Sequence, residues 1–172
     1  IKKEYSLVQN IDNMLFKKDA PLKDEYQYLY ASIFKNPESY LKIIEALANK
    51  KIGLTRDEII KETGIGNTGS LSNKLEELEV CGFIRKYNVL GNKKKYALYQ
   101  LIDPYTLFYH HFLKNYPSDE HFWTNQINTP KINTWMGLAF ERLCFSHIKQ
   151  IKKKLGIASV LTEVYSWKTN AD

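Results

Sequence analysis

A run of short polar side chains opens one predicted helix, and it carries the chemistry that is easiest to interpret. The stretch that starts at Thr68 and ends at Cys81-Gly82 places Leu71, Leu75 and Leu78 at helical spacing, which predicts a helix with one apolar face. The first turns of this helix present small polar or basic groups suited to base edges and phosphates: Thr68, Ser70, Ser72, Asn73 and Lys74. We therefore expect contact with double-stranded DNA at this end of the helix.

A second group of cations follows in a predicted β-hairpin. Residues 83–87 are strand-like, residues 90–92 form a turn and residues 95–101 alternate with period two. The hairpin carries five cations that can reach phosphates: Arg85, Lys86, Lys93, Lys94 and Lys95. We expect the hairpin to pack beside the helix, so that both face one phosphate backbone.

The same residues also allow a second interpretation, in which the module does not bind DNA. The later turns of the helix carry Glu76, Glu77 and Glu79, and no arginine stands where a guanine would be read. The alternative is a module that packs against protein and has a solvated lysine turn.

The elements before this helix predict how it is held. Thr55 and Glu58 form a capping box, and the short helix behind them ends at Gly64. Two short helices around a glycine-containing turn are typical of a helix-turn-helix. Further helices are predicted over residues 6–16 and 24–34, and a third follows the N-cap Asn36. The order of helices and hairpin predicts a mainly α fold, with a winged helix-turn-helix over residues 37–104.

The last third of the chain contains one carboxylate in an unusual place. We expect a helix over residues 105–116, a long helix over residues 134–155 and a strand over residues 159–167. Glu141 falls inside the apolar arc of the long helix, where an isolated charge costs several kcal/mol. One interpretation is an acid facing a following sheet, for a metal or nuclease-type site. The other is an edge residue capped by an amide or a lysine.

Other reactive residues predict no site of their own. The histidines lack metal-ligand spacing, so we expect no metal ion at His110, His111, His121 and His147. The sequence has no P-loop motif, so we expect no ATP binding by this chain itself. Cys81 and Cys144 each stand among apolar residues, which predicts two buried thiols in a reducing cytoplasm.

Composition sets broad limits. A chain of 172 residues, 44% hydrophobic and 26% charged, is typical of a soluble globular protein of one large domain or two small ones. The net charge of +6 is compatible with a polyanionic partner. No apolar run is long enough for a membrane span, and no secretion leader opens the chain, so we expect a cytoplasmic protein without a membrane partner. Both ends suggest a piece of a longer protein.

Six segments resemble one known family. They are SLVQNI at 6–11, YLYASIF at 28–34, LTRDEI at 54–59, CGFI at 81–84, LIDPYTLFY at 101–109 and GLAFE at 137–141. The family is that of the archaeal-type AAA+ ATPases, which are also widespread in bacteria, and the resemblance runs from about residue 6 to residue 167. Its members are similar in having a P-loop ATPase domain, a winged helix and a C-terminal domain like the PD-(D/E)XK nucleases.

The resemblance implies a division of the chain. Residues 1–36 would end the ATPase lid region, residues 37–104 would be the winged helix, and residues 105–172 would be a helical segment that opens the nuclease-like domain. Glu141 matches one acid of the family's nuclease motif, while the other acids would lie beyond Asp172. The chain by itself would then be non-catalytic, with ATP and Mg²⁺ used by the longer parent and the parent's ATPase domain as a partner.

Two other functions remain as alternatives. A protein-interaction module that couples the ATPase to a partner predicts a large apolar patch around Phe108, Phe112, Phe122 and Trp123. A winged-helix transcription regulator predicts a symmetric dimer on a defined operator.

Overall fold

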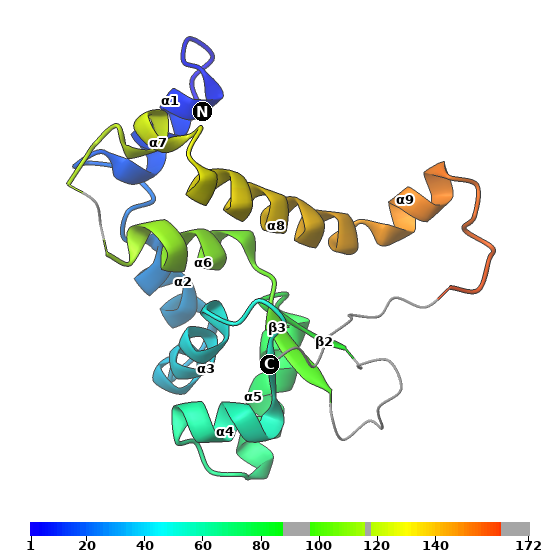
Figure 1. Cartoon of the computed structure of the whole chain (residues 1–172). Helices are drawn as coiled ribbons and strands as arrows, with labels where there is room; N and C mark the ends of the chain where they lie inside the picture. Colours follow the sequence, from blue (N-terminus) through cyan, green and yellow to red (C-terminus); the bar gives the residue numbers. More distant parts are fainter. Residues whose placement is uncertain (88–96, 116–117, 163–172) are drawn as a thin grey trace. The chain divides into compact units, whose positions relative to one another are not determined.

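The computed structural model describes residues 1–87, 97–115 and 118–162, and the fold is mainly helical (Figure 1). Its elements, in chain order, are α1 (Leu7–Ile11), the π-helical η1 (Asp12–Phe16), α2 (Glu25–Ile33), α3 (Glu38–Ala48), β1 (Leu54–Thr55), α4 (Arg56–Thr63), α5 (Gly69–Val80), β2 (Ile84–Tyr87), β3 (Leu98–Leu101), α6 (Pro104–Phe108), the π-helical η3 (Tyr109–Leu113), α7 (Phe122–Gln126), α8 (Pro130–Ser146) and α9 (Ile148–Lys154).

The chain divides into two compact units. The central unit contains the described residues 24–87 and 97–114, and the flanking unit contains residues 1–23, 115 and 118–162. The described residues of the stretch 37–104 singled out in the sequence lie within the central unit, together with α2, α6 and η3.

The local signals at the start and the end of α4 act as the sequence predicts. The Thr55 hydroxyl accepts the Glu58 amide at 3.3 Å, and the Glu58 carboxylate accepts the Thr55 amide at 2.7 Å. Gly64 ends α4 in the left-handed conformation, with φ of 69°. The capping box and the glycine stop are therefore confirmed. The cap predicted at Asn36 is wrong, because Pro37 occupies the N-cap of α3 without a side-chain bond.

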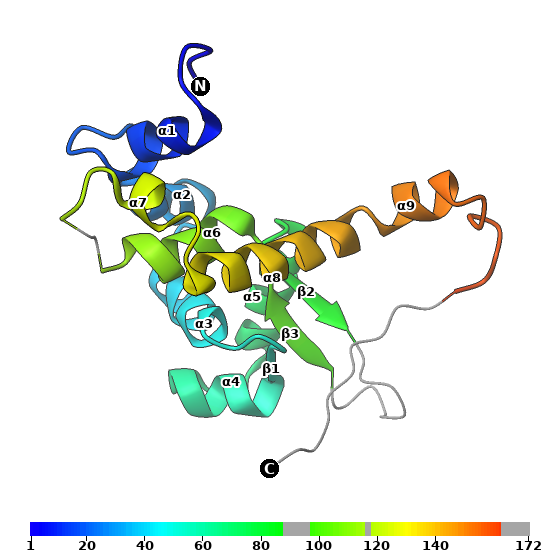
Figure 2. The same ribbon diagram turned by 45° about the horizontal axis from the view of Figure 1, so that its top comes forward.

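Three short strands form one antiparallel sheet in the order β1-β3-β2. Strand β3 pairs Tyr99 with Leu54 of β1, and on its other side it pairs Leu101 with Ile84 of β2. Figure 2 shows the strands side by side, with β3 in the middle. The sequence predicted β2 and β3 but missed β1, because a strand of two residues has no detectable period.

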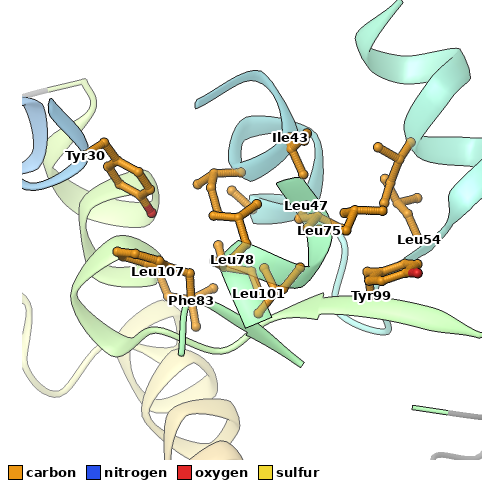
Figure 3. Close-up of a cluster of buried hydrophobic side chains, with 14 of the residues drawn as sticks. Tyr30, Ile43, Leu47, Leu54, Leu75, Leu78, Phe83, Tyr99, Leu101 and Leu107 are labelled. Carbon is orange, nitrogen blue, oxygen red and sulfur yellow. The ribbon is translucent and has the colours of Figure 1, made fainter. Parts of the chain in front are cut away.

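One hydrophobic core holds the central unit together (Figure 3). Leu71, Leu75 and Leu78 are all buried along one face of α5, as their spacing predicted. Phe83, just before β2, stacks on Tyr30 of α2 with ring centroids 4.7 Å apart. Each fully buried leucine contributes about 1.5–3 kcal/mol. These contacts fix α5 through one face and leave its other face on the surface.

A polar network ties the sheet to the loop between α3 and β1. The buried Gln100 side chain accepts the Arg85 Nε–H at 2.8 Å and donates to the Lys51 carbonyl. The Tyr87 hydroxyl donates to the Ile52 carbonyl in the same loop. Gly53 then passes so close to β3 that an added Cβ would lie less than 3.0 Å from the Tyr99 carbonyl oxygen.

A buried carboxylate organises the flanking unit. Asp12 is 2% exposed, and it accepts the Trp123 amide at 2.8 Å and the Thr124 amide at 3.1 Å. These are amides of the first turn of α7, where a carboxylate is favoured by the unpaired N–H groups of a helix start. Asp12 thereby joins η1 to α7 across more than a hundred residues.

The C-terminal helix differs from the prediction. Instead of one helix over residues 134–155, α8 ends at Ser146 and α9 begins at Ile148, with His147 between them at φ −109° and ψ 18°. Residues 159–162 of the predicted strand form turn and coil, and residues 163–167 lie outside the described residues. A 3.6-residue period does not reveal a single residue that leaves the helical conformation.

The predicted burial of both thiols is wrong. Cys81 is exposed and Cys144 is half-buried, and both are free. Cys81 caps the C-terminal end of α5 beside Val80, which is itself 81% exposed. An apolar neighbour in sequence does not imply a buried one in space. In the part of the chain that is described, no helix combines the length and apolar character needed to cross a bilayer.

His110 lies in an aromatic cluster of the central unit. Its Nε2 hydrogen-bonds the Tyr26 hydroxyl at 3.0 Å, and the Tyr26 ring stacks on Tyr109 at 3.8 Å between centroids. Burial lowers the pKa of His110 from 6.5 to about 4, with Lys114 acting in the same direction and Glu45 opposing it. The imidazole is therefore neutral at pH 7, which matches its bond to a hydroxyl.

We expect Gly53→Ala to destabilise the central unit by about 2–4 kcal/mol, because it combines left-handed backbone strain with a clash against the Tyr99 carbonyl. Urea denaturation followed by far-UV circular dichroism measures this loss. Gly64→Ala has a positive φ but open space around the added methyl group, so it is the matched control and should cost less. Equal losses in the two variants would contradict the close-approach argument.

The pKa of His110 also predicts a pH dependence of stability. The folded pKa is below the unfolded one, so the unfolded chain takes up the proton first and stability falls as the pH drops from about 6.5 toward 4. We expect His110→Gln to reduce this loss of stability by about 1–2 kcal/mol. The value is smaller than the full difference between the folded and unfolded pKa of His110 would give, because the ring is partly exposed. Denaturation at pH 7.5, 6 and 4.5 measures it, with the exposed His121→Gln as control. Identical pH profiles for wild type and His110→Gln would refute the assignment.

Candidate nucleic-acid interface

The first turns of α5 expose most of the polar side chains that the sequence singled out. Thr68, Ser70, Ser72 and Asn73 are all exposed, and Thr68 is the N-cap residue without a side-chain capping bond. Lys74 is half-buried, since its Nζ donates to the Ser70 hydroxyl at 2.7 Å and lies 5.6 Å from the centre of the Tyr40 ring. The surface therefore offers several small donors and acceptors and one partly engaged ammonium group.

Arg56 positions the turn in front of α5. Its Nε–H donates to the Asn67 side-chain oxygen at 3.0 Å, and its terminal nitrogen donates to the Thr68 carbonyl at 2.9 Å. The planar guanidinium group can hold both acceptors at once because its donors form a rigid fork. The start of α4 is thereby connected to the start of α5. No role was expected for Arg56 from the sequence, although an arginine at a helix start followed eleven residues later by an asparagine in a turn is the pattern that indicates this contact.

The cations of the β2–β3 pair differ in availability. Arg85 is half-buried, bonded to Gln100 and 5.4 Å from the centre of the Tyr87 ring, so it supports the sheet. Lys86 is exposed, with its Nζ 5.7 Å from the centre of the Tyr99 ring. Lys93, Lys94 and Lys95 lie outside the described residues. Lys86 is thus the described cation of this pair best placed to meet a phosphate.

The strand pair does pack beside α5, but toward the end of the helix. The Lys86 amide donates to the Glu79 carboxylate at 3.0 Å, and the Phe83 amide donates to the Leu78 carbonyl at 2.9 Å. Glu79 is nine residues beyond Ser70, which is about 13 Å along a helix axis. Lys86 and the polar turn at Ser70 therefore face different positions, and a ligand that meets both must be extended.

Acidic residues occupy the last turns of α5, as far as the position of Lys86. Glu76, Glu77 and Glu79 are all exposed on α5, against the single cation Lys74 on the same helix. Like charges repel a phosphate backbone over roughly 8–10 Å at ordinary salt. Contact with DNA through the last turns of α5 is accordingly disfavoured, and the first turn of α5 and Lys86 of β2 remain.

Glu141 does not occupy the buried position that its helical arc predicted. It is exposed on α8. Of the apolar arc expected around it, Phe140 and Leu143 are 66% and 52% exposed, and Ile148 is only half-buried. Helical periodicity indicates which residues share a face, but a face is buried only where another element covers it. The argument that this carboxylate must have a partner therefore does not hold.

The remaining candidates form no common site. His110 and His111 have different partners, the Tyr26 hydroxyl and the Leu107 carbonyl. Among the described residues, no three His, Cys, Asp or Glu side chains are grouped so that they could hold a metal ion. The large apolar patch that the protein-interaction alternative predicts is wrong, because Phe108, Phe112 and Trp123 are buried and Phe122 is half-buried.

Comparison with known proteins adds no relative to this picture. No protein-family model, curated protein or solved structure matches the chain.

The double contact of Arg56 leads to a prediction about the turn. We expect Arg56→Ala to lower stability by about 0.5–1.5 kcal/mol, since both bonds are near the surface, and to speed amide exchange at residues 66–68. Hydrogen–deuterium exchange by mass spectrometry measures the local effect. Arg56→Lys retains the charge but not the fork, so its exchange should be intermediate. Exchange at wild-type rates in Arg56→Ala would show that the clamp does not order the turn.

Proposed function

We propose that residues 37–104 are a winged helix that contacts duplex DNA mainly through phosphates, within the C-terminal part of an AAA+ ATPase. The observation that carries the proposal is the exposed polar start of α5, presented on a helix whose opposite face is fixed in the core. The order α3, β1, α4, α5, β2, β3 and the sheet order β1-β3-β2 support the winged-helix assignment.

Phosphate contact is favoured over base reading by the types of side chain present. Thr68, Ser70 and Asn73 can donate to phosphate oxygens, and Lys86 adds a charge at the other end of the surface. The acidic last turns of α5 oppose insertion of the whole helix into a groove. The function is thus binding with little sequence preference, strengthened by the lysines of residues 93–95.

The ATPase assignment rests on the resemblance of the six sequence segments. In such a protein the winged helix would bring the ATPase domain to DNA, and ATP and Mg²⁺ would act in that domain. In this proposal the role of the chain itself is to bind DNA, and the ATPase chemistry belongs to the other domain.

The test is a titration of the chain with a fluorescent 20-base-pair duplex at 50 and 200 mM salt. For about three phosphate contacts, we expect the affinity to fall about 40-fold between the two salt concentrations. A second duplex of unrelated sequence should bind within a few-fold of the first. Absence of binding at about 100 μM, or binding that does not depend on salt, would contradict the proposal.

Charge variants test which end of the surface is used. We expect Lys86→Ala to weaken binding and to reduce the slope of log affinity against log salt by about 0.9, because one phosphate contact is lost. The triple variant K93A/K94A/K95A should reduce the slope further. Lys42→Ala, an exposed lysine of α3, is the charge-matched control. A control that weakens binding as much as Lys86→Ala would place the contact elsewhere.

A further inference from the structure

A groove runs between the end of α2, the start of α3 and the exposed face of α5. Its volume is about 640 Å³, and all its lining residues belong to the central unit. Ile33 and Lys35 come from the α2 side, Tyr40 from α3, and Glu76 and Val80 from α5. This size is in the range of sites that hold a few side chains of a ligand. The groove is a surface distinct from the polar first turn of α5, although Asn73 lines both.

The groove presents aliphatic groups that the fold does not use. Val80 is 81% exposed and Ile33 is 44% exposed, whereas Leu78, two residues before Val80, and Phe34, next to Ile33, are buried. An aliphatic side chain placed against Val80 and Ile33 would remove apolar surface from water, which stabilises a complex by roughly 25 cal/mol per Å². The groove can therefore accept an aliphatic anchor.

One wall of the groove is acidic and ordered. Glu76 and Val80 are four residues apart on α5, so their side chains are neighbours on the helix surface. Next to them, the Tyr40 hydroxyl donates to the Glu77 carboxylate, and burial together with this bond raises the pKa of Tyr40 to about 12. Tyr40 therefore remains a donor at neutral pH and holds Glu77 in place.

The charges around the groove favour a cation on the α5 side. Glu76, Glu77 and the nearby Glu79 oppose two ammonium groups, Lys35 on the other wall and Lys74, whose Nζ is bound to Ser70. A phosphate backbone would be repelled by this wall, while a lysine or arginine beside an aliphatic residue would meet a carboxylate one helical turn from Val80.

We infer that this groove binds a short segment of a partner protein in which an aliphatic residue is adjacent to a lysine or arginine. The aliphatic side chain lies between Ile33 and Val80, and the cation pairs with Glu76 and Glu77. This inference does not depend on DNA binding, because it uses the acidic part of α5 that DNA contact avoids. A contact of this size is weak, so its detection needs a method that captures weak binding.

Cys81 provides such a method, because it is exposed and lines the groove. Three short peptides carry the same tag, which is a thiol held in a disulfide. The full chain with Cys144→Ser is incubated with these peptides under conditions in which the Cys81 thiol and the tag exchange disulfides reversibly. The peptides contain Lys-Leu, Glu-Leu or Lys-Ser and are otherwise identical. Mass spectrometry gives the fraction of chain captured by each peptide. We expect Lys-Leu to be captured at least threefold more than either of the other two.

Matched variants separate recognition from thiol reactivity. E76Q/E77Q should bring Lys-Leu and Glu-Leu to nearly equal capture, and glutamine still offers an oxygen to the Tyr40 hydroxyl. Val80→Ser should bring Lys-Leu and Lys-Ser together. Glu79→Gln, which removes one carboxylate that does not line the groove, is the control and should retain most of the preference. Changes in the reactivity of Cys81 affect all three peptides alike, so the ratios are independent of them.

The inference is overturned if the three peptides are captured equally by the folded chain, if Glu-Leu is preferred, or if the same preference persists in 8 M urea. The same variants also distinguish this site from DNA contact. Removal of the two carboxylates in E76Q/E77Q should weaken peptide capture and strengthen DNA binding, so the two activities respond in opposite directions. If the chain binds DNA but shows no peptide preference, the groove proposal has failed. If it shows the peptide preference but binds no DNA, the DNA proposal has failed.

Discussion

Burial of one leucine face of α5 is the interaction on which the rest of the central unit depends. Leu71, Leu75 and Leu78 lie in the core, and the chain then turns at Gly82 so that Phe83 reaches Tyr30. Because the hydrophobic effect acts on area and not on direction, these contacts hold the helix firmly while they leave its opposite face exposed. The polar, acidic and aliphatic surfaces of this unit all include residues of that exposed face, and neighbouring residues of α2, α3 and β2 complete them.

The polar contacts around this core determine how individual turns and strands are positioned. Arg56 joins the starts of α4 and α5, and Gln100 joins β2 and β3 to the loop that contains Gly53. A buried amide such as that of Gln100 would be costly if it lacked partners, and here both its oxygen and its nitrogen are bonded. Such contacts add little net stability, but they specify one register of the sheet and one position of the turn.

The exposed face of α5 combines two surfaces of opposite character. Its first turns offer hydroxyl and amide groups and one lysine, and its last turns offer carboxylates beside Val80. The electrostatic field of a carboxylate is felt over a Debye length, which is comparable to two helical turns. A polyanion and a cationic segment would therefore select different ends of the same helix. Because the two surfaces are separate, two ligands could bind the same helix at once. Binding of one ligand would change the electrostatic potential at the site of the other.

The sequence by itself determined the local features of this protein. The capping box at Thr55, the stop at Gly64 and the buried leucines of α5 all follow from interactions between residues close in the chain, and the structure has them as predicted. Only the tertiary structure decided what depends on distant segments: that β1 joins the sheet, that Cys81 and Glu141 are exposed, and that a groove forms between α2, α3 and α5. Periodicity indicates which side chains share a face, whereas burial requires a covering partner, and that partner comes from elsewhere in the chain.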